Sequence, residues 1–290
     1  MKNWLAHTSL QLISYLPLSV NQRIGRIIGF IGWYVSANMR QRTLLNLDRC
    51  YPEKSTAWKT KVGREALCSS AEALLETPTL WKAGKDKIAS LLLNPESLDT
   101  IKTTYAKGDG LIVVVLHLGS WEYLGLITAM HTKTTSAYRP LNLPALNELV
   151  VKGRQSTGAR LVPSTFKGIR ELTKALSNKQ SICILPDQEP RRDQGIYADF
   201  FGKPAYTTNL MPKLAARHNT PVLYIAAERK RNGYYLHIEE GVKALYDKDL
   251  VTACNAMNSQ IETMINKFPE QYSWSYKRFK RLPDGTNLYS

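Results

Sequence analysis

Residues 111–122 read LIVVVLHLGSWE, and this stretch decides the fold of the chain. Six apolar residues lead into His117, a Gly-Ser turn follows, and Glu122 lies five positions after the histidine. The run predicts a buried strand that delivers His117 to its carboxyl end, with a helix starting at once. In open α/β sheets, functional sites form outside the carboxyl ends of the strands. An imidazole with a carboxylate within reach is a minimal arrangement for general-base catalysis on a hydroxyl.

Beyond residue 110, short apolar segments alternate with amphipathic ones. The predicted strands are 111–116, 134–138, 181–185, 222–227 and 234–238. The predicted helices are 121–130, 144–155, 168–176, 208–218 and 250–267. This rhythm predicts an α/β fold with a mostly parallel central sheet flanked by helices. The hairpin signal Arg231-Asn232-Gly233 predicts that the last two strands pair antiparallel.

The first 80 residues are predicted to be helical. Residues 4–16 and 21–39 form helices broken at Pro17, residues 42–48 could extend the second, and 56–80 form a long amphipathic helix. The purest apolar stretch, 27–35, is too short to span a bilayer as an ordinary helix. A cleavable signal peptide is not indicated. The pattern favours an interfacial amphipathic helix or helical hairpin over a helix that simply packs on the domain.

The 290 residues carry a formal net charge of +15, which predicts an anionic partner. Nucleic acid, an acidic membrane face, a phosphorylated substrate and an acidic carrier protein all qualify, and a plain solvated basic surface is the alternative. No RNP-like motif, zinc finger or helix-turn-helix signal supports nucleic acid. The absence of a Walker A loop or GxGxxG argues against a nucleotide cofactor. The four cysteines lack metal-ligand spacing, so we expect no metal and free, mostly buried thiols.

His117 and Glu122 are the first candidate catalytic pair. Ser120 is a plausible N-cap, which places Glu122 at the second helical position. From there its carboxylate could reach back to His117, hold the imidazole tautomer and stabilise the imidazolium. No serine nucleophile is needed if the acceptor brings its own hydroxyl. The alternative is a packed histidine and a glutamate favoured by the helix dipole.

Two further candidates follow other predicted strands. Arg139 could clamp a phosphate or stabilise an oxyanion, or could be a surface arginine. Asp187 could orient Arg139 or a substrate hydroxyl, or belong to a plain turn.

The segment 200–209 pairs two phenylalanines with Gly202 and suggests an apolar wall. Thr207 and Thr208 could cap the next helix and leave free N–H groups for an anion, or form a simple cap and hydrophobic staple. The basic run 229–231 lies at the hairpin tip, where we expect it to be solvated. Residues 274–281 interleave aromatics with cations, as in single-stranded nucleic-acid binding or at a membrane-facing or substrate-facing edge.

Taken together, these motifs resemble the lipid A biosynthesis acyltransferase family, within the wider glycerolipid acyltransferase group. The central motifs are HLGSWE at 117–122, YRP at 138–140 with Asn142 and Pro144, PDQ at 186–188, and FG at 201–202 with Ala205, Thr207 and Thr208. Flanking blocks are RTLLNL at 42–47 with CYP at 50–52, and PEQYSW at 269–274 with KRF at 277–279. The likeness covers roughly residues 40–285, with the motifs in the same order.

The resemblance implies transfer of a fatty acyl chain from acyl carrier protein to a hydroxyl of a lipid A precursor. It implies no cofactor and no covalent acyl-enzyme. His117 would be the general base and Glu122 its partner. The implied substrate-binding residues are Arg139, Asp187, Gly202, Thr207 and Thr208.

The resemblance also implies a place on the cytoplasmic face of the inner membrane, peripheral or anchored at the N-terminus. Residues 1–40 would be a membrane-associating helical segment and 41–290 the acyltransferase domain. The positive charge suits a phosphorylated glycolipid, an acidic carrier protein and an anionic bilayer together. The N-terminal apolar segment is shorter and more interrupted than a firm transmembrane anchor.

Two rivals remain open at this point. One is a related acyltransferase that acts on a lysophospholipid, an aminolipid or another glycolipid. The other is a non-catalytic basic protein that binds membranes or nucleic acid.

Overall fold

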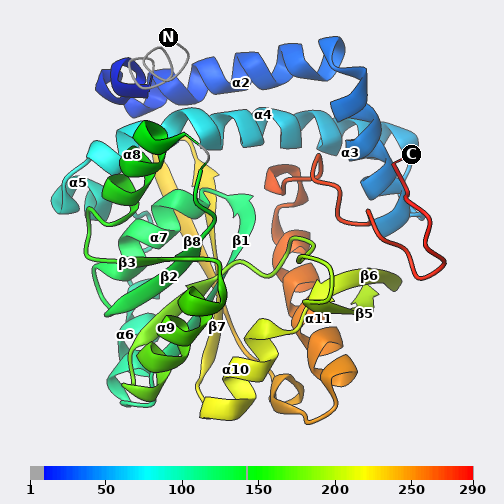
Figure 1. Cartoon of the computed structure of the whole chain (residues 1–290). Helices are drawn as coiled ribbons and strands as arrows, with labels where there is room; N and C mark the ends of the chain where they lie inside the picture. The colour runs from blue at the N-terminus through cyan, green and yellow to red at the C-terminus, as the bar shows by residue number, and fades with distance from the viewer. Residues whose placement is uncertain (1–9, 142, 290) are drawn as a thin grey trace.

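The computed structural model describes residues 10–141 and 143–289, which form an α/β fold around a six-stranded sheet (Figure 1). The strand order is β3-β2-β4-β1-β7-β8, and every pair is parallel except β7 with β8. The predicted fold class, α/β with a mostly parallel sheet, is confirmed. The sheet strands are β1 (Leu111–Gly119), β2 (Thr134–Tyr138), β3 (Arg160–Pro163), β4 (Ser181–Ile184), β7 (Val222–Lys230) and β8 (Gly233–Glu240).

Helices cover both faces of this sheet because β1 buries both of its own faces. Ile112, Val114 and Leu116 pack into one hydrophobic cluster, and Val113 and Val115 into the other. The first cluster holds residues from α9, α10 and α11, and the second holds residues from α5, α6 and α7. The helices below α4 are α5 (Lys85–Ser90), α6 (Ser97–Ala106), α7 (Trp121–Ala129), α8 (Pro144–Arg154), α9 (Phe166–Ser177), α10 (Leu210–His218) and α11 (Leu250–Lys267), with 3-10 turns η1 (Lys243–Tyr246) and η2 (Pro269–Gln271).

Two long helices, α2 (Leu18–Val35) and α4 (Thr56–Lys82), run side by side across the top of the sheet (Figure 1). Along the chain, α3 (Ala37–Cys50) follows α2 and precedes α4. The single helix predicted over 21–39 is therefore broken at Ser36. Ser36 accepts a hydrogen bond from the Met39 amide, as an N-cap does. The helix predicted over 4–16 lies partly outside the described residues. Within its described part, residues 10–15 are helical.

The outer face of α2 is apolar and exposed. Its buried side, Asn21, Gly25, Gly29 and Trp33, recurs every four residues against α4. The exposed residues on the opposite side are Ile24, Ile27, Ile28, Phe30, Ile31, Tyr34 and Val35. Within residues 10–141 and 143–289, no helix combines the length and the apolar character needed to cross a membrane.

Three strands were not predicted from the sequence, and one of them, β3, lies at the edge of the main sheet. Residues 195–208 form an antiparallel hairpin, β5 (Gly195–Phe200) and β6 (Lys203–Thr208), outside the main sheet. The helix expected from Thr208 therefore begins two residues later, at Leu210, with Asn209 in the N-cap position. The predicted β7–β8 hairpin is confirmed, since Lys230 pairs with Gly233. All four cysteines are free and buried, as expected.

Two glycines of α2 give a direct test of its packing on α4. A methyl group on Gly29 would lie 2.4 Å from the Cα atom of Cys68, so Gly29→Ala forces the helices apart and should destabilise the fold by about 1–3 kcal/mol. Gly32 meets no atom within 4 Å, so Gly32→Ala should stabilise by up to about 1 kcal/mol through helix propensity. Urea unfolding measures both, and equal effects would contradict the close contact.

Candidate active site

The side chain of His117 is held by Asp187 at the carboxyl end of β1. The Nδ1 atom of His117 lies 2.9 Å from Asp187 Oδ1, and the His117 backbone N–H donates to Oδ2 at 2.9 Å. Asp187 is 1% exposed, whereas the His117 side chain keeps 23% exposure. Burial alone would raise the pKa of Asp187, but the His117 imidazole and these two hydrogen bonds outweigh it and hold that pKa below its usual value. The carboxylate therefore stays ionised, which favours a proton on Nδ1 and leaves Nε2 free as a base.

Strand register brings these two residues together. β1 and β4 are adjacent and parallel, with Val114 opposite Ile184. Continuing that register three residues along each chain places His117 beside Asp187. Asp187 was expected to orient Arg139 or a substrate hydroxyl, or to belong to a plain turn, and it contacts His117 instead.

Glu122 has other partners. It lies in the first turn of α7 as predicted, but its carboxylate accepts two hydrogen bonds from Arg154 Nε, at 3.1 and 3.0 Å, and another from Arg154 Nη2. The Trp81 indole donates to it at 2.9 Å. Among the described residues no hydrogen bond or ion pair joins Glu122 to His117. Burial would lower the pKa of Arg154, but the Glu122 charge outweighs it and raises that pKa.

Trp81 and Arg154 were not singled out in the sequence. Glu122 thus connects α7 to Trp81 on α4 and to Arg154 on α8. Gly153 allows this arrangement, because a methyl group there would lie 2.4 Å from the Trp81 ring. A Gly-Arg dipeptide at the end of a helix carries no catalytic signature, so only the fold reveals these contacts.

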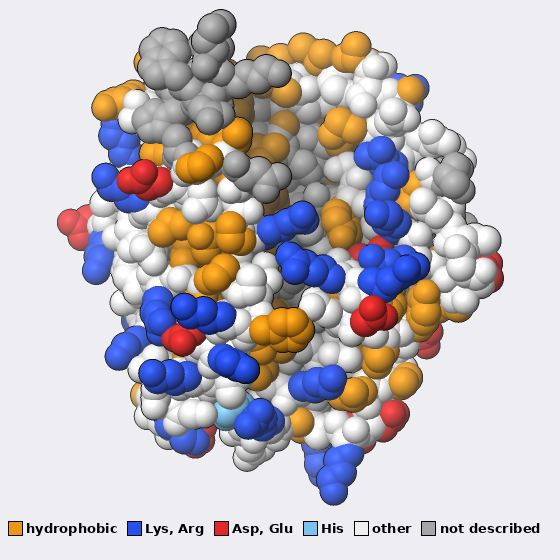
Figure 2. All heavy atoms as spheres, in the orientation of Figure 1, with side chains coloured by type: hydrophobic (Ala, Val, Ile, Leu, Met, Phe, Trp, Pro, Cys, Tyr) orange, Lys and Arg blue, Asp and Glu red, His pale blue; other side chains and the backbone are white. Residues whose placement is uncertain are grey.

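His117 and Glu122 line one cavity of about 560 Å³. Arg139, Arg154 and Arg191 contribute cations to its wall. Its apolar lining includes Val115, Leu126, Ala137, Ala159, Leu161 and Cys183. Figure 2 shows basic side chains gathered around the middle of this face of the molecule. Among the described residues, no cluster of His, Cys, Asp and Glu could hold a metal ion.

The remaining predicted substrate-binding residues are only partly brought to this cavity. Arg139 and Thr208 line it, and the Thr208 hydroxyl accepts from the amide of Leu210. Gly202 lies at the tip of the β5–β6 hairpin, away from the cavity lining, with φ +66°.

Thr207 is fully buried and also lies outside the cavity lining. It accepts hydrogen bonds from Arg278 Nη2 at 2.8 Å and from the Asn258 amide at 3.2 Å. Part of the C-terminal segment 274–281 therefore packs inward, and its Tyr276 lines the cavity. Trp274, Arg278 and Phe279 are buried and do not form an exposed aromatic and basic edge.

The comparison with known proteins bears on what this site does. A family model described as bacterial lipid A biosynthesis acyltransferase matches residues 1–281. The chain belongs to this family. It is 28% identical to a lipid A biosynthesis palmitoleoyltransferase of Escherichia coli (strain K12), over 99% of this chain and 94% of that protein.

Other relatives in the same family carry related names. A lipid A biosynthesis acyltransferase of Haemophilus influenzae is 26% identical over 97% of this chain and 91% of its own length. A lipid A biosynthesis lauroyltransferase of Escherichia coli (strain K12) is 24% identical over 97% of this chain and 92% of its own length. Family membership supports an acyltransferase activity in lipid A biosynthesis.

The Asp187–His117 contact can be tested by Asp187→Asn. The asparagine amide can present a donor to Nδ1, which would favour the wrong imidazole tautomer, so kcat in an acyl-transfer assay should fall by about 10²–10⁴-fold. Asp193→Asn, the same change at an exposed position further along the loop, is the matched control and should leave kcat unchanged. Comparable rates for the two variants would remove Asp187 from the mechanism.

Proposed function

We propose that this protein transfers a fatty acyl chain from acyl carrier protein to a hydroxyl of a lipid A precursor, in the late, secondary acylation steps. The observation that carries the proposal is a histidine whose Nδ1 is engaged by a buried carboxylate, beside a cavity with basic and apolar walls. Membership of the family supports the acceptor class.

His117 would act as general base on the acceptor. Its Nε2 removes the proton of the acceptor hydroxyl as the oxygen attacks the carbonyl carbon of the acyl thioester. The tetrahedral intermediate then collapses, the C–S bond breaks, and the imidazolium returns the proton to the leaving thiolate. Asp187 stabilises the imidazolium between these steps. No acyl-enzyme forms, because the attacking oxygen belongs to the substrate.

The cations of the cavity would stabilise negative charge. Arg154 is oriented by Glu122 and lines the same cavity as His117, so its guanidinium is placed to stabilise the developing oxyanion. On this account Glu122 serves catalysis through Arg154, and Asp187 takes the partner role that was expected of Glu122. Arg139 and Arg191 would receive phosphate groups of the acceptor or the carrier.

Acyl transfer to a lysophospholipid is the competing interpretation of the same geometry. The mass of lipid A from cells that lack this protein decides between the two acceptors. We expect a species short by one acyl chain, restored by the wild-type gene. His117→Ala and Glu122→Ala should not restore it, since general-base catalysis and oxyanion stabilisation are each worth about 10²-fold or more.

The control is His131→Ala, a histidine just beyond α7 that does not line the cavity and should restore lipid A fully. Unchanged lipid A in the deletion strain, together with acylation of a lysophospholipid by the purified protein, would overturn the acceptor assignment.

We further propose that residues 1–40 associate peripherally with the inner membrane on its cytoplasmic face, and that 41–290 form the acyltransferase domain. The exposed apolar side of α2 supports this, because an interfacial helix buries such a face at the lipid boundary. The net charge of +15 suits an anionic bilayer.

Ile27→Asp with Ile31→Asp tests this orientation, since these side chains are 58% and 53% exposed on the outer side of α2. Binding to vesicles of phosphatidylglycerol and phosphatidylethanolamine should weaken at least about tenfold, given the transfer energy of two isoleucines. Val242→Asp with Val251→Asp adds the same charge at exposed valines outside α2 and should keep most of the affinity. Equal losses would mean that added charge, and not the α2 face, is responsible.

A further inference from the structure

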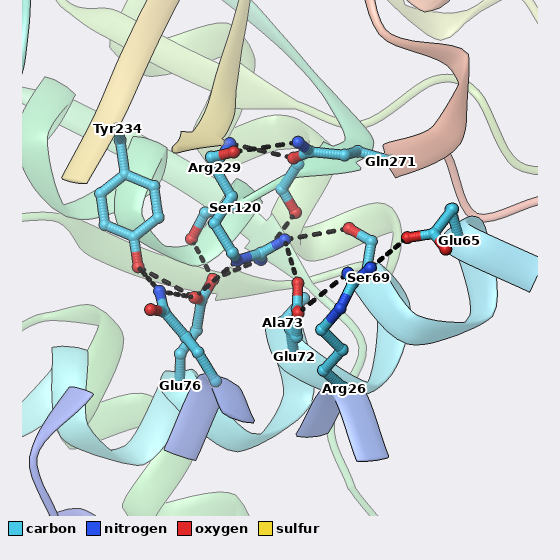
Figure 3. Close-up of polar contacts among 12 residues, drawn as sticks. Arg26, Glu65, Ser69, Glu72, Ala73, Glu76, Ser120, Arg229, Tyr234 and Gln271 are labelled. Atoms are coloured by element: carbon cyan, nitrogen blue, oxygen red, sulfur yellow. Dashed lines mark hydrogen bonds and ion pairs between the residues drawn. The ribbon is translucent and has the colours of Figure 1, made fainter. Parts of the chain in front are cut away.

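A buried network of charged side chains lies behind the turn that joins His117 to Glu122 (Figure 3). At its centre Arg229 of β7 forms a two-pronged ion pair with Glu76 of α4, at 2.8 Å from Nε and 2.6 Å from Nη2. Glu76 is fully buried and Arg229 nearly so. The expectation that the basic run at the β7–β8 hairpin is solvated was therefore wrong for Arg229.

The Glu76 carboxylate has no acceptor capacity to spare. Besides Arg229, it receives the hydroxyl of Tyr234 at 2.9 Å, the amide of Gln22 at 2.9 Å and the hydroxyl of Ser120 at 2.5 Å. Burial alone would raise the pKa of Glu76, but Arg229 and these donors hold it below its usual value, so the group is an anion. A carboxylate held by this many hydrogen bonds is a rigid support for the groups that donate to it.

One end of the network fixes the turn itself. Ser120 occupies the N-cap position of α7, yet its side chain makes no cap hydrogen bond and donates to Glu76 instead. Arg229 Nη2 also lies 3.4 Å from the carbonyl oxygen of Gly119, and the Ser120 amide donates to the Ala227 carbonyl at 2.8 Å.

The backbone of this turn is in a conformation that needs such support. Gly119 has φ +64°, in the left-handed region. A methyl group there would lie 2.0 Å from the Ala227 oxygen, so the turn presses against β7. The turn spans the few residues that separate His117 from Glu122, and its shape therefore sets the relative placement of the two.

Stability alone does not account for this ion pair. Taking two charges out of water carries a large desolvation penalty, and well-packed apolar residues often stabilise a core equally well. An apolar pair could neither accept a hydrogen bond from the Ser120 hydroxyl nor donate one to the Gly119 carbonyl, as Glu76 and Arg229 do.

We propose that Glu76 and Arg229 are positioning residues for the acyl-transfer site: they hold the Gly119–Ser120 turn so that His117 and the Glu122–Arg154 pair face the cavity in a productive arrangement. The inference rests on the proposed function, because it concerns the rate of that reaction. Neither residue is part of the cavity lining, so both would act through the turn.

The test compares two buried serines of the same network. Ser120→Ala removes the hydrogen bond from the turn to Glu76. Ser69→Ala removes a hydrogen bond to Arg229 Nη1 of 2.9 Å, on α4 and away from the turn. Both serines are almost fully buried, so the two variants should show similar decreases in Tm. Well below either Tm, Ser120→Ala should lower kcat at least about tenfold with KM unchanged, since small misplacements of catalytic groups are costly, whereas Ser69→Ala should keep the wild-type kcat.

A purely structural role predicts that both variants lose Tm and that both keep the wild-type kcat. That result would overturn the proposal. If Ser120→Ala does not fold, Ser120→Cys against Ser69→Cys makes the same comparison, because a thiol is close in size and a weak donor. His117→Ala separates the two claims. Full activity of His117→Ala would refute the proposed function, while an inactive His117→Ala with equal kcat for the serine variants would refute the positioning role alone.

Discussion

The hydrogen bonding of β1 to β4 on one edge and to β7 on the other is the constraint on which this molecule depends. The β4 side brings Asp187 to His117 through strand register. The β7 side brings Ala227 against the turn and delivers Arg229 behind it. Because β1 is also buried on both faces, it cannot slide without losing both sets of contacts. The position of the histidine is therefore a property of the sheet and does not depend on a flexible loop.

Three carboxylates surround the turn after β1, and each is paired with a different basic side chain. Asp187 is paired with His117, Glu122 with Arg154 and Glu76 with Arg229. The imidazole of His117 is the one of these three basic groups that can accept and return a proton as a general base. Of the other two, Arg154 lines the cavity, whereas Arg229 lies behind the turn and contacts it.

Much of the fold was predictable, because alternating apolar strands and amphipathic helices follow directly from side-chain periodicity. The partner of His117 was not, since Glu122 is the nearer carboxylate in sequence, and only the order of the strands, a tertiary property, places Asp187 beside the histidine. The assignment of Arg229 as solvated failed for a related reason. A hairpin position usually indicates exposure, but α4 packs over Arg229. The sequence around 229–231 gives no indication that Glu76 is its partner. The β5–β6 hairpin was missed because Gly202 was interpreted as part of an apolar wall, and Thr207 and Thr208 as a helix cap.

The Glu76–Arg229 pair also has a consequence for biogenesis. The two residues are 153 positions apart, so the ribosome completes α4 long before the cation that neutralises it exists. Until β7 is made, the Glu76 side of α4 must stay hydrated, and the helix cannot pack fully against the sheet. Closing a loop of this length carries a cost in chain entropy before the contact is gained. The turn can therefore have its full set of partners only once β7 has been made, and a nascent chain that stops short of β7 contains the histidine without the residues that hold the turn behind it.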